Sequence, residues 1–386
     1  MRRLVLSFGL LVLLPADLHA QPVERFARAW TVDSFGEEPL FRPVELVALT
    51  TCEVWVSDAG NAFVYRWDCN GRPVGRVGGR GEGPGEFVLP APLSRQRGDT
   101  VVVLDQPQGR ISYFDRGGRF VRSEAIQIPP PETGFARGFG RASGTTVVHA
   151  DNYPTTEPRP NERFSFLWPL GADGRRGSAV LRMPAPGMLI DRGGGASARI
   201  DAPFRRRPIT LFRPDGTLLV GNTGSREFRR YRIGPRLVPA GTLHLDLPAY
   251  RVTRAERRAW SDSVRAQLAS DLDRSGADPS ARASFRERHE RLVRGATFPA
   301  THPYYVMAAQ DESGNLWLQL PVRRGQTRTR WQVRSGVTGK LLRTIEFTPG
   351  GTITAAAALG GSLFTIEVDG DGVASVSRYG RVRTRR

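Results

Sequence analysis

The sequence Val54-Trp55-Val56-Ser57-Asp58 is followed by Val64-Tyr65-Arg66-Trp67-Asp68 and then by Gly71-Arg72-Pro73-Val74. The same order of residue types returns in Val101-Val102-Val103-Leu104-Asp105, Ile111-Ser112-Tyr113-Phe114-Asp115 and Gly118-Arg119-Phe120-Val121. Asp58 and Asp105, Asp68 and Asp115, and Gly71 and Gly118 are each 47 residues apart. Three matched pairs at one spacing define an internal repeat, and its short β-branched and aromatic segments predict a fold built from repeated β units.

Less regular copies follow, each with short strand-like segments bounded by Gly, Asp or Asn. They cover residues 145–174, 214–233, 313–339 and 352–378. Together with the two clear copies they make six units of four short strands, which predicts an all-β fold, a six-bladed β-propeller. The last unit has only three strands. We expect Arg28–Val32 to complete it and to close the ring, because closure removes exposed sheet edges.

The segment between the two clear copies is rich in glycine. It reads Gly78-Gly79-Arg80-Gly81-Glu82-Gly83-Pro84-Gly85-Glu86-Phe87, with Pro90 after it. This segment resembles the turn between blades in the exported bacterial six-bladed β-propeller proteins of the NHL-repeat class, and the similarity extends from Trp55 to Val121. The resemblance implies a propeller fold in an exported protein. It implies no particular reaction, because that family has no settled biochemical activity.

Strand signals disappear over residues 253–294. Thr253 and Glu256 have the spacing of a helix capping box. The apolar residues that follow recur at four-residue steps, as in an amphipathic helix: Trp260, Val264, Leu268 and Leu272. Ser275-Gly276 ends this helix, and Asp278-Pro279 begins a second one. We therefore expect a helical hairpin inserted between blades four and five, where it either decorates one face or forms a lid over the central channel.

The beginning of the chain has the order of a secretory signal peptide. Basic Arg2-Arg3 precedes an apolar run from Leu4 to Pro15, and the segment from Ala16 to Ala20 ends in a small residue. We expect cleavage near Ala20, with residues 1–20 removed and residues 21–386 forming a secreted or periplasmic propeller. The apolar run is shorter than the ~20 residues that span a bilayer. We therefore expect a protein that does not span the membrane.

The two cysteines, Cys52 and Cys69, flank a predicted strand pair whose turn lies at Gly60-Asn61. The midpoint between the cysteines falls in that turn, so they face each other across an antiparallel hairpin at a separation that a disulfide can span. An exported protein meets conditions that allow disulfides to form. The sequence predicts a Cys52–Cys69 disulfide, and two independent buried thiols are the alternative.

The formal net charge of +18 is unevenly distributed. Residues 205–386 carry 32 basic and 16 acidic side chains, whereas residues 21–204 carry 22 and 21. The candidate surface for an anionic partner consists of Arg205, Arg206, Arg207, Arg229, Arg230, Arg323 and Arg324. The alternative is an ordinary solvated arginine surface. Export argues against a nucleic-acid partner.

The densest cluster of polar and aromatic residues begins at His149, where a predicted strand runs into an irregular proline-rich loop. Loops on a rigid scaffold often carry binding residues. The candidate ligand-binding residues are therefore His149, Asp151, Asn152 and Tyr153.

Asp58, Asp105 and Asp151 recur at the ends of equivalent predicted strands. A ring of such carboxylates could bind Ca²⁺, which takes six to eight oxygen ligands. An Asp that opens a tight turn also accepts hydrogen bonds from its own backbone, and repetition is what such a structural role predicts. We predict turn capping for these residues, and neither a metal site nor a cofactor.

These features predict an exported, non-catalytic propeller that acts as a binding scaffold for a protein, a peptide or an anionic envelope ligand. The sequence contains no recognisable set of catalytic residues, which favours binding over catalysis. The alternative is a Ca²⁺-dependent hydrolase of the lactonase or arylesterase type, with Ca²⁺ in the central channel, as a resemblance to six-bladed gluconolactonases and paraoxonases would imply. The sequence does not clearly match their ligand motifs, and it predicts no oligomeric state.

Overall fold

The protein is described by a computed structural model that covers residues 22–127, 136–151, 164–171, 173–178, 180–185, 187–191 and 198–382. Over these residues the chain is all-β apart from a single-turn 3-10 helix and two long helices. The expected signal peptide, residues 1–20 with its cleavage position near Ala20, lies outside them. In the part of the chain that is described, no helix is both long enough and apolar enough to cross a membrane.

Four sheets of four antiparallel strands follow one another along the chain. The first contains β4 (Pro43–Ala48), β5 (Glu53–Asp58), β6 (Phe63–Asp68) and β7 (Pro73–Gly78). The second contains β8 (Pro90–Arg95), β9 (Val101–Asp105), β10 (Arg110–Phe114) and β11 (Phe120–Ala125). The third contains β12 (Ala136–Ala142), β13 (Thr145–Asp151), β14 (Phe164–Leu170) and β15 (Leu181–Pro184). The fourth contains β18 (Pro208–Phe212), β19 (Thr217–Asn222), β20 (Glu227–Ile233) and β21 (Leu237–His244).

The remaining long strands form one eight-stranded sheet. One half is β22 (Met307–Gln310), β23 (Leu316–Gln319), β24 (Thr329–Arg334) and β25 (Leu341–Phe347), and the other is β26 (Thr352–Leu359), β27 (Ser362–Val368), β28 (Ala374–Arg381) and β1 (Val23–Val32). The beginning of β1 runs parallel to β25, from Val23 to Arg25, and its remainder pairs antiparallel with β28. The expected pairing of Arg28–Val32 with the last unit is therefore present. The expectation of six separate blades is met only in part, because β1 is long enough to join the last two units.

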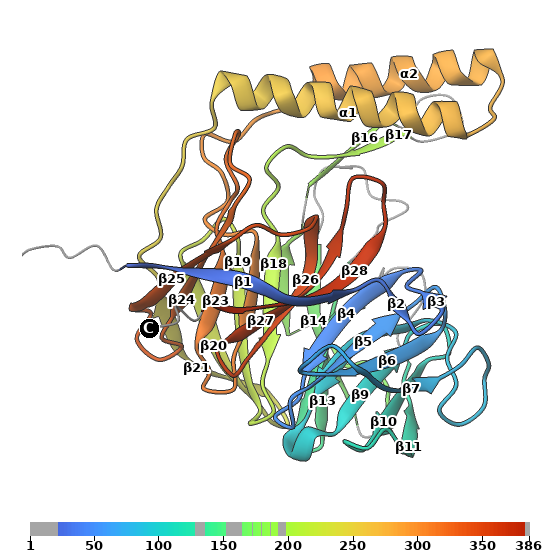
Figure 1. The fold of residues 1–386 in the computed structure, drawn as a ribbon, viewed down its shortest axis with the longest axis vertical. Helices are drawn as coiled ribbons and strands as arrows, with labels where there is room; N and C mark the ends of the chain where they lie inside the picture. The colour runs from blue at the N-terminus through green and yellow to red at the C-terminus, as the bar shows by residue number, and fades with distance from the viewer. Residues whose placement is uncertain are drawn as a thin grey trace, which may run out of the picture.

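Apolar side chains fill the interfaces between consecutive sheets. Val64 of the first sheet shares a cluster with Val103 of the second, and further clusters join the second sheet to the third, the third to the fourth, and the fourth to β23. Tyr65 of the first sheet also packs with Ile366 of β27, although the two are far apart in the sequence. Because the first and last sheets are neighbours, the sheets form a propeller-like ring (Figure 1).

Two aspartates of the repeat hold the turn segments as the sequence predicts. Asp58 is fully buried and accepts hydrogen bonds from the backbone N–H groups of Phe41 at 2.8 Å, Arg42 at 2.9 Å and Gly60 at 3.0 Å. Asp105 is equally buried and accepts a hydrogen bond from the Val88 N–H at 2.7 Å. Each carboxylate therefore satisfies backbone donors where the chain enters its sheet, which buried polar groups require.

The expected disulfide between Cys52 and Cys69 is present, with 5.3 Å between the two Cα atoms. Glu53 pairs with Asp68 in the β5–β6 ladder, so the cysteines occupy the next position beyond that pair. The register that brings them together is therefore the one centred on the Gly60-Asn61 turn.

The helices α1 (Arg254–Arg274) and α2 (Pro279–Arg294) follow β21 and precede β22. Thr253 and Glu256 form the predicted capping box, and Asp278 accepts hydrogen bonds from the first backbone N–H groups of α2. The two helices lie together as a layer beyond one end of the ring (Figure 1). Arg291 of α2 forms an ion pair of 3.0 Å with Asp191, which belongs to the short hairpin of β16 (Met188–Asp191) and β17 (Ala198–Asp201).

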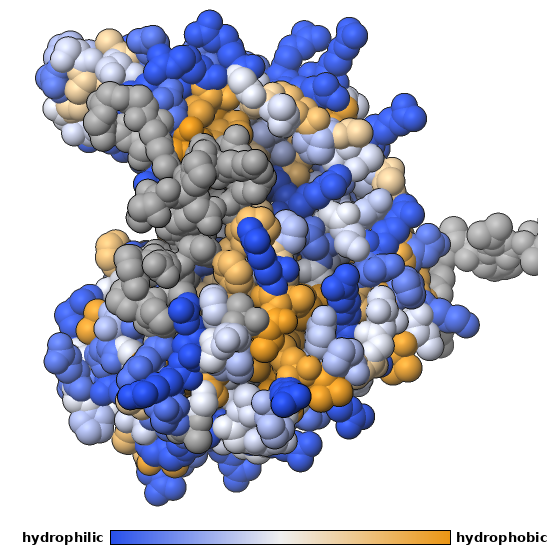
Figure 2. Space-filling model, turned by 180° about the vertical axis from the view of Figure 1, so that it is seen from behind, coloured by the Kyte–Doolittle hydropathy of each residue, from blue (hydrophilic) through white to orange (hydrophobic). Residues whose placement is uncertain are grey.

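The opposite view of the molecule shows a band of apolar side chains surrounded by hydrophilic ones (Figure 2).

A further short hairpin, β2 (Ser34–Phe35) and β3 (Glu38–Pro39), connects β1 to the first sheet. Its Phe35 ring stacks on Tyr65 with 5.0 Å between centroids, so this connection is packed against the core.

Candidate functional site

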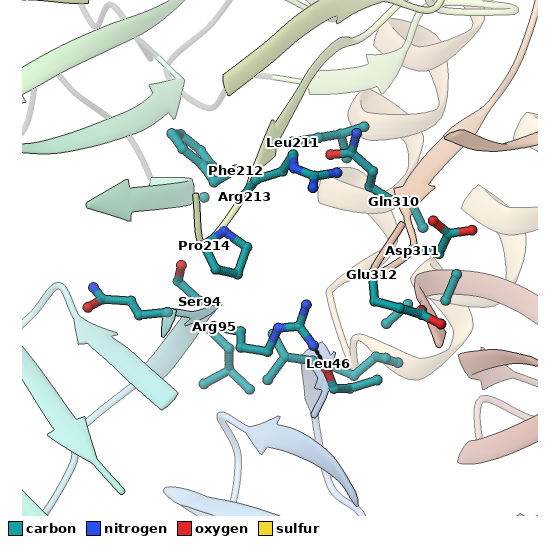
Figure 3. Close-up of a pocket in the computed structure, with 18 of the residues that line it drawn as sticks. Leu46, Ser94, Arg95, Leu211, Phe212, Arg213, Pro214, Gln310, Asp311 and Glu312 are labelled. Atoms are coloured by element: carbon teal, nitrogen blue, oxygen red, sulfur yellow. Dashed lines mark hydrogen bonds between the residues drawn. The ribbon is translucent and has the colours of Figure 1, made fainter. Parts of the chain in front are cut away.

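The first strands of the sheets surround a central channel. Its main cavity has a volume of about 630 Å³ and is lined by residues of β4, β8, β12, β18, β22 and β26. Figure 3 shows Leu46, Arg95 and Gln310 facing this opening from three different strands, and Arg213 facing it from the position directly after β18. A ring of sheets therefore brings together side chains that are more than 200 residues apart in the sequence.

A second cavity of about 320 Å³ opens at the other end of the channel. The two cavities share Arg137, Thr210, Leu211 and Ala308, so they meet inside the ring. The strand β18 shows their order, since it begins at Pro208 in the second cavity and leads to Arg213 in the first. We call the second cavity the basic mouth, and its polar residues are Arg137, His149, Asp151, Arg205, Arg207, Thr210 and Thr354.

Asp151 is the buried carboxylate of the basic mouth and is only 7% exposed. It accepts a hydrogen bond from Nε of Arg137 at 2.7 Å, and the hydroxyl of Ser165 donates to its other oxygen. Asp151 lies at the end of β13, whereas Arg137 comes from β12 and Ser165 from β14. Among the described residues its hydrogen bonds therefore come from side chains. The predicted turn capping by Asp151 stays a prediction, because the backbone segments before β12 and after β13 lie outside the described residues.

His149 lies two residues before Asp151 on the same strand and is 3% exposed. Its Nδ1 is 2.9 Å from the hydroxyl of Thr210, which belongs to the next sheet. Its Nε2 is buried and has no hydrogen-bond partner among the described residues. Burial lowers the pKa of His149 to about 4, an effect that the Asp151 charge opposes and the Arg137 charge reinforces. The imidazole is therefore neutral near pH 7.

Two arginines enter the basic mouth from the segment that precedes β18. Arg205 forms an ion pair with Asp201. The guanidinium of Arg207 makes no hydrogen bond or ion pair with any residue that the structure describes. Burial lowers the pKa of Arg207, and the nearby positive charges of Arg205 and Arg137 lower it further, against the opposing effects of Asp201 and Asp151.

Among the residues that the structure describes, the charges at the basic mouth do not balance. Arg137, Arg205 and Arg207 supply three positive charges, and Asp151 and Asp201 supply two negative ones. His149 adds none near neutral pH, because its pKa is low. Arg207 is exposed at the cavity and makes no ion pair with the described residues, so its guanidinium is available to donate charge-assisted hydrogen bonds to an anion. The arrangement is therefore suited to holding a carboxylate, a sulfate or a phosphate.

The charged residues at the far end of the channel are mostly engaged with one another. Asp99 accepts a hydrogen bond from Thr50 and lies 3.9 Å from Arg95, and Asp215 pairs with Arg213 at 3.0 Å. Glu45 is different because it lies on the channel wall of β4 without an ion pair in the described residues. Burial raises its pKa to about 7, although a backbone hydrogen bond from Leu46 acts in the other direction.

The remaining predicted arginines do not converge on the basic mouth. Arg206 packs against Gly224, and Arg229 and Arg230 lie on β20. Arg230 donates to the carbonyl of Gly336 at 2.5 Å, which links neighbouring sheets. Arg323 and Arg324 lie in the exposed segment between β23 and β24, where the Arg323 guanidinium is 5.6 Å from the Tyr250 ring centre. Of the predicted ligand-binding residues, Asn152 and Tyr153 lie outside the described residues.

Sequence reasoning missed Arg137, Thr210 and Ser165. Each belongs to a strand whose pattern indicates only β structure, and each contacts His149 or Asp151 through the packing of strands or sheets. The available signal was the departure of the third copy from the repeat, since Asp151 matches Asp58 and Asp105 in position while its neighbours differ.

The basic mouth does not have the composition of a calcium site. Within the described residues, no three His, Cys, Asp or Glu side chains form a group that could hold a metal ion. Ca²⁺ takes six to eight oxygen ligands, whereas guanidinium groups already neutralise the two carboxylates here. The donor set therefore does not fit Ca²⁺.

No family model matches the chain, and no curated protein matches its sequence. Solved structures that resemble it include a protein of Bacteroides fragilis that is expected to be exported. The two chains are 11% identical, the match covers 95% of this chain and 98% of that one, and the TM-score is 0.47. A gluconolactonase of Xanthomonas campestris has 12% identity, coverage of 92% and 88%, and a TM-score of 0.43. Regucalcin, a calcium-binding protein of Agrobacterium tumefaciens, has 11% identity, coverage of 94% and 97%, and a TM-score of 0.41. Sequence identities and TM-scores this low support no argument about function, so the function has to be argued from the residues of the site.

Proposed function

We propose that this chain is an exported, non-catalytic six-bladed propeller that binds an anionic ligand at its basic mouth. The observation that carries the proposal is Arg207, which lines the basic mouth beside Arg205 and Arg137 and whose guanidinium has no partner in the described residues. The export component rests on the order of residues 1–20. The six-bladed component counts the two halves of the eight-stranded sheet as two blades.

The chemistry of arginine defines the ligand class. A guanidinium donates two parallel hydrogen bonds to a carboxylate or a phosphate, and such charge-assisted pairs are stronger than neutral hydrogen bonds. Arg205 is held by Asp201 and Arg137 by Asp151, so both remain beside the cavity before a ligand arrives. This preorganisation reduces the entropy that is lost on binding.

The contacts of Asp151 and His149 favour binding over catalysis at this site. Asp151 would be the natural general base, but both of its carboxylate oxygens already accept hydrogen bonds, from Arg137 and from Ser165. His149 has a free Nε2, but that atom is buried and its ring is held against Thr210. Neither group is placed as a nucleophile with an adjacent base, as covalent catalysis requires.

Isothermal titration calorimetry with inorganic phosphate tests the proposal on the full mature chain. We expect Arg207→Ala to weaken phosphate binding by about 10- to 100-fold, because it removes a charge-assisted interaction. Arg229→Ala is the matched control, since Arg229 is an exposed arginine in the same basic half of the chain but lies outside the mouth. Circular dichroism and the melting temperature show whether each variant is folded.

Equal affinity for phosphate in Arg207→Ala and the wild type would overturn the proposal. So would a protein that binds no phosphate but gains thermal stability from Ca²⁺ and hydrolyses lactones. That second result would support the alternative, a lactonase or arylesterase-like hydrolase, because an ion that binds only the folded state raises its melting temperature.

A further inference from the structure

A third cavity of about 350 Å³ adjoins the basic mouth and shares Arg205, Arg207 and Val306 with it. We call it the apolar side pocket. Its apolar residues are Ala202, Phe204, Trp260, Pro303, Val306, Pro321 and Val322. Its volume is at the lower end of the range of about 300–1,000 Å³ that small-molecule sites occupy.

One wall of the apolar side pocket comes from the helical insertion. Trp260 of α1 is half-buried, and its ring meets Phe298 edge-on with 5.4 Å between centroids. Phe298 in turn lies 6.4 Å from Phe204, so three aromatic rings from separate segments are packed together. The hairpin therefore contributes an aromatic surface beside the arginines of the basic mouth.

Phe204 has a backbone conformation that supports a functional role for this pocket. Its φ is +48°, in the left-handed region that bulky residues rarely adopt. The Phe204 ring meets His302 edge-on with 4.6 Å between centroids, and His302 lies 3.2 Å from the carboxylate of Glu256. Strained residues of this kind gather at ligand-binding sites, where the surrounding structure holds them in place. Here the left-handed residue directly precedes Arg205 in the chain.

We propose that the ligand is an amphiphilic anion, with its acidic group at Arg207 and an apolar ring or short acyl chain in the apolar side pocket. This inference rests on the proposed function, because it assigns the second half of the same ligand. A wholly polar anion would leave the aromatic surface of Trp260 in contact with water, whereas an apolar group there removes that surface from water. An uncharged apolar molecule would leave the charge of Arg207 without a partner.

The test compares two probes that have the same acidic group, inorganic phosphate and 1-naphthyl phosphate, by calorimetry on the full mature chain. We expect the wild type to bind 1-naphthyl phosphate about tenfold or more tightly than phosphate, because the naphthyl ring buries apolar area. We expect Trp260→Ala to lose most of this difference while its affinity for phosphate stays unchanged. Trp260→Phe keeps an aromatic wall and is the conservative control, and we expect it to retain most of the difference.

Each other outcome has a distinct meaning. Equal binding of the two probes by the wild type would overturn the amphiphilic ligand and leave the anion site intact. Undiminished preference for 1-naphthyl phosphate in a folded Trp260→Ala variant would also overturn it, because the apolar group would then bind elsewhere. Binding of neither probe would overturn the proposed function and this inference together. Arg207→Ala should weaken both probes by a similar factor.

Discussion

Three aspartates at equivalent positions of the repeat bind different partners. Asp58 and Asp105 accept hydrogen bonds from backbone N–H groups and hold turn segments in place. Asp151 instead accepts hydrogen bonds from the side chains of Arg137 and Ser165. The same residue type at the same position is therefore structural in two sheets and part of the basic mouth in the third. Among the described residues, the neighbouring strands β12 and β14 bring the side chains of Arg137 and Ser165 to Asp151.

Glu45 provides a test of the electrostatics inside the channel. Its pKa rises from 4.5 to about 7 in the folded protein because burial disfavours the charged form. Between these pH values the unfolded state loses the proton while the folded state keeps it, so the free energy of unfolding falls as pH rises. Glu45→Gln cannot ionise. We expect its stability relative to the wild type to increase from pH 4.5 to pH 7, by about 1–3 kcal/mol.

Urea unfolding at a series of pH values measures this difference, with Glu37→Gln as a control for the loss of an exposed carboxylate. A difference between Glu45→Gln and the wild type that stays constant from pH 4.5 to pH 7 would contradict the buried environment of Glu45.

At the scale of elements, β1 joins the two ends of the chain. It pairs with β25 through Val23–Arg25 and with β28 through the rest of its length, so it connects both halves of the eight-stranded sheet. Phe26 is 6% exposed and belongs to the apolar cluster between these halves, with its ring centre 6.4 Å from that of Trp317. The strand therefore stabilises the ring by burial as well as by pairing.

We expect Phe26→Ala to lower the free energy of unfolding by about 3–5 kcal/mol, because it removes a buried ring and leaves a cavity. Val23→Ala on the same strand is the control, since Val23 is 43% exposed, and we expect it to cost less than about 1 kcal/mol. Denaturant unfolding of the two variants measures both values. A similar loss of unfolding free energy in the two variants would contradict the claim that burial of Phe26 stabilises the closed ring of sheets.

The elements that could be predicted from the sequence are those with local signals. The repeat located β5 and β6 to within a residue, and the capping box at Thr253 located the start of α1. The joining of two units by β1 could not be predicted, because it depends on pairing between residues more than 300 positions apart. The basic mouth is a similar case. His149 and Arg207 were visible as separate polar and basic features, but their meeting depends on how the third sheet packs against the fourth.

At the scale of the whole molecule, the net charge of +18 is less informative than its arrangement. Most of the arginines in the second half of the chain lie on outer strands, in exposed segments or in ion pairs, as Arg229, Arg324 and Arg330 do. A small group that includes Arg205 and Arg207 lines the basic mouth, where the positive charge of the described residues exceeds the negative charge and the helical hairpin provides an aromatic neighbour. The ring makes this possible because it directs side chains from several sheets to one axis.

The central claim is that an anion binds at the basic mouth rather than elsewhere on a basic surface. Crystals of the mature protein soaked in sodium selenate would locate such an anion through the anomalous scattering of selenium. The peak marks the selenium atom, which lies one Se–O bond beyond the oxygen that accepts a charge-assisted hydrogen bond of about 2.8 Å. We therefore predict the strongest peak at about 4 Å from the guanidinium nitrogens of Arg207, with Arg137 and Arg205 around it. A strongest peak beside Arg229 or Arg323, with none at the basic mouth, would contradict this account.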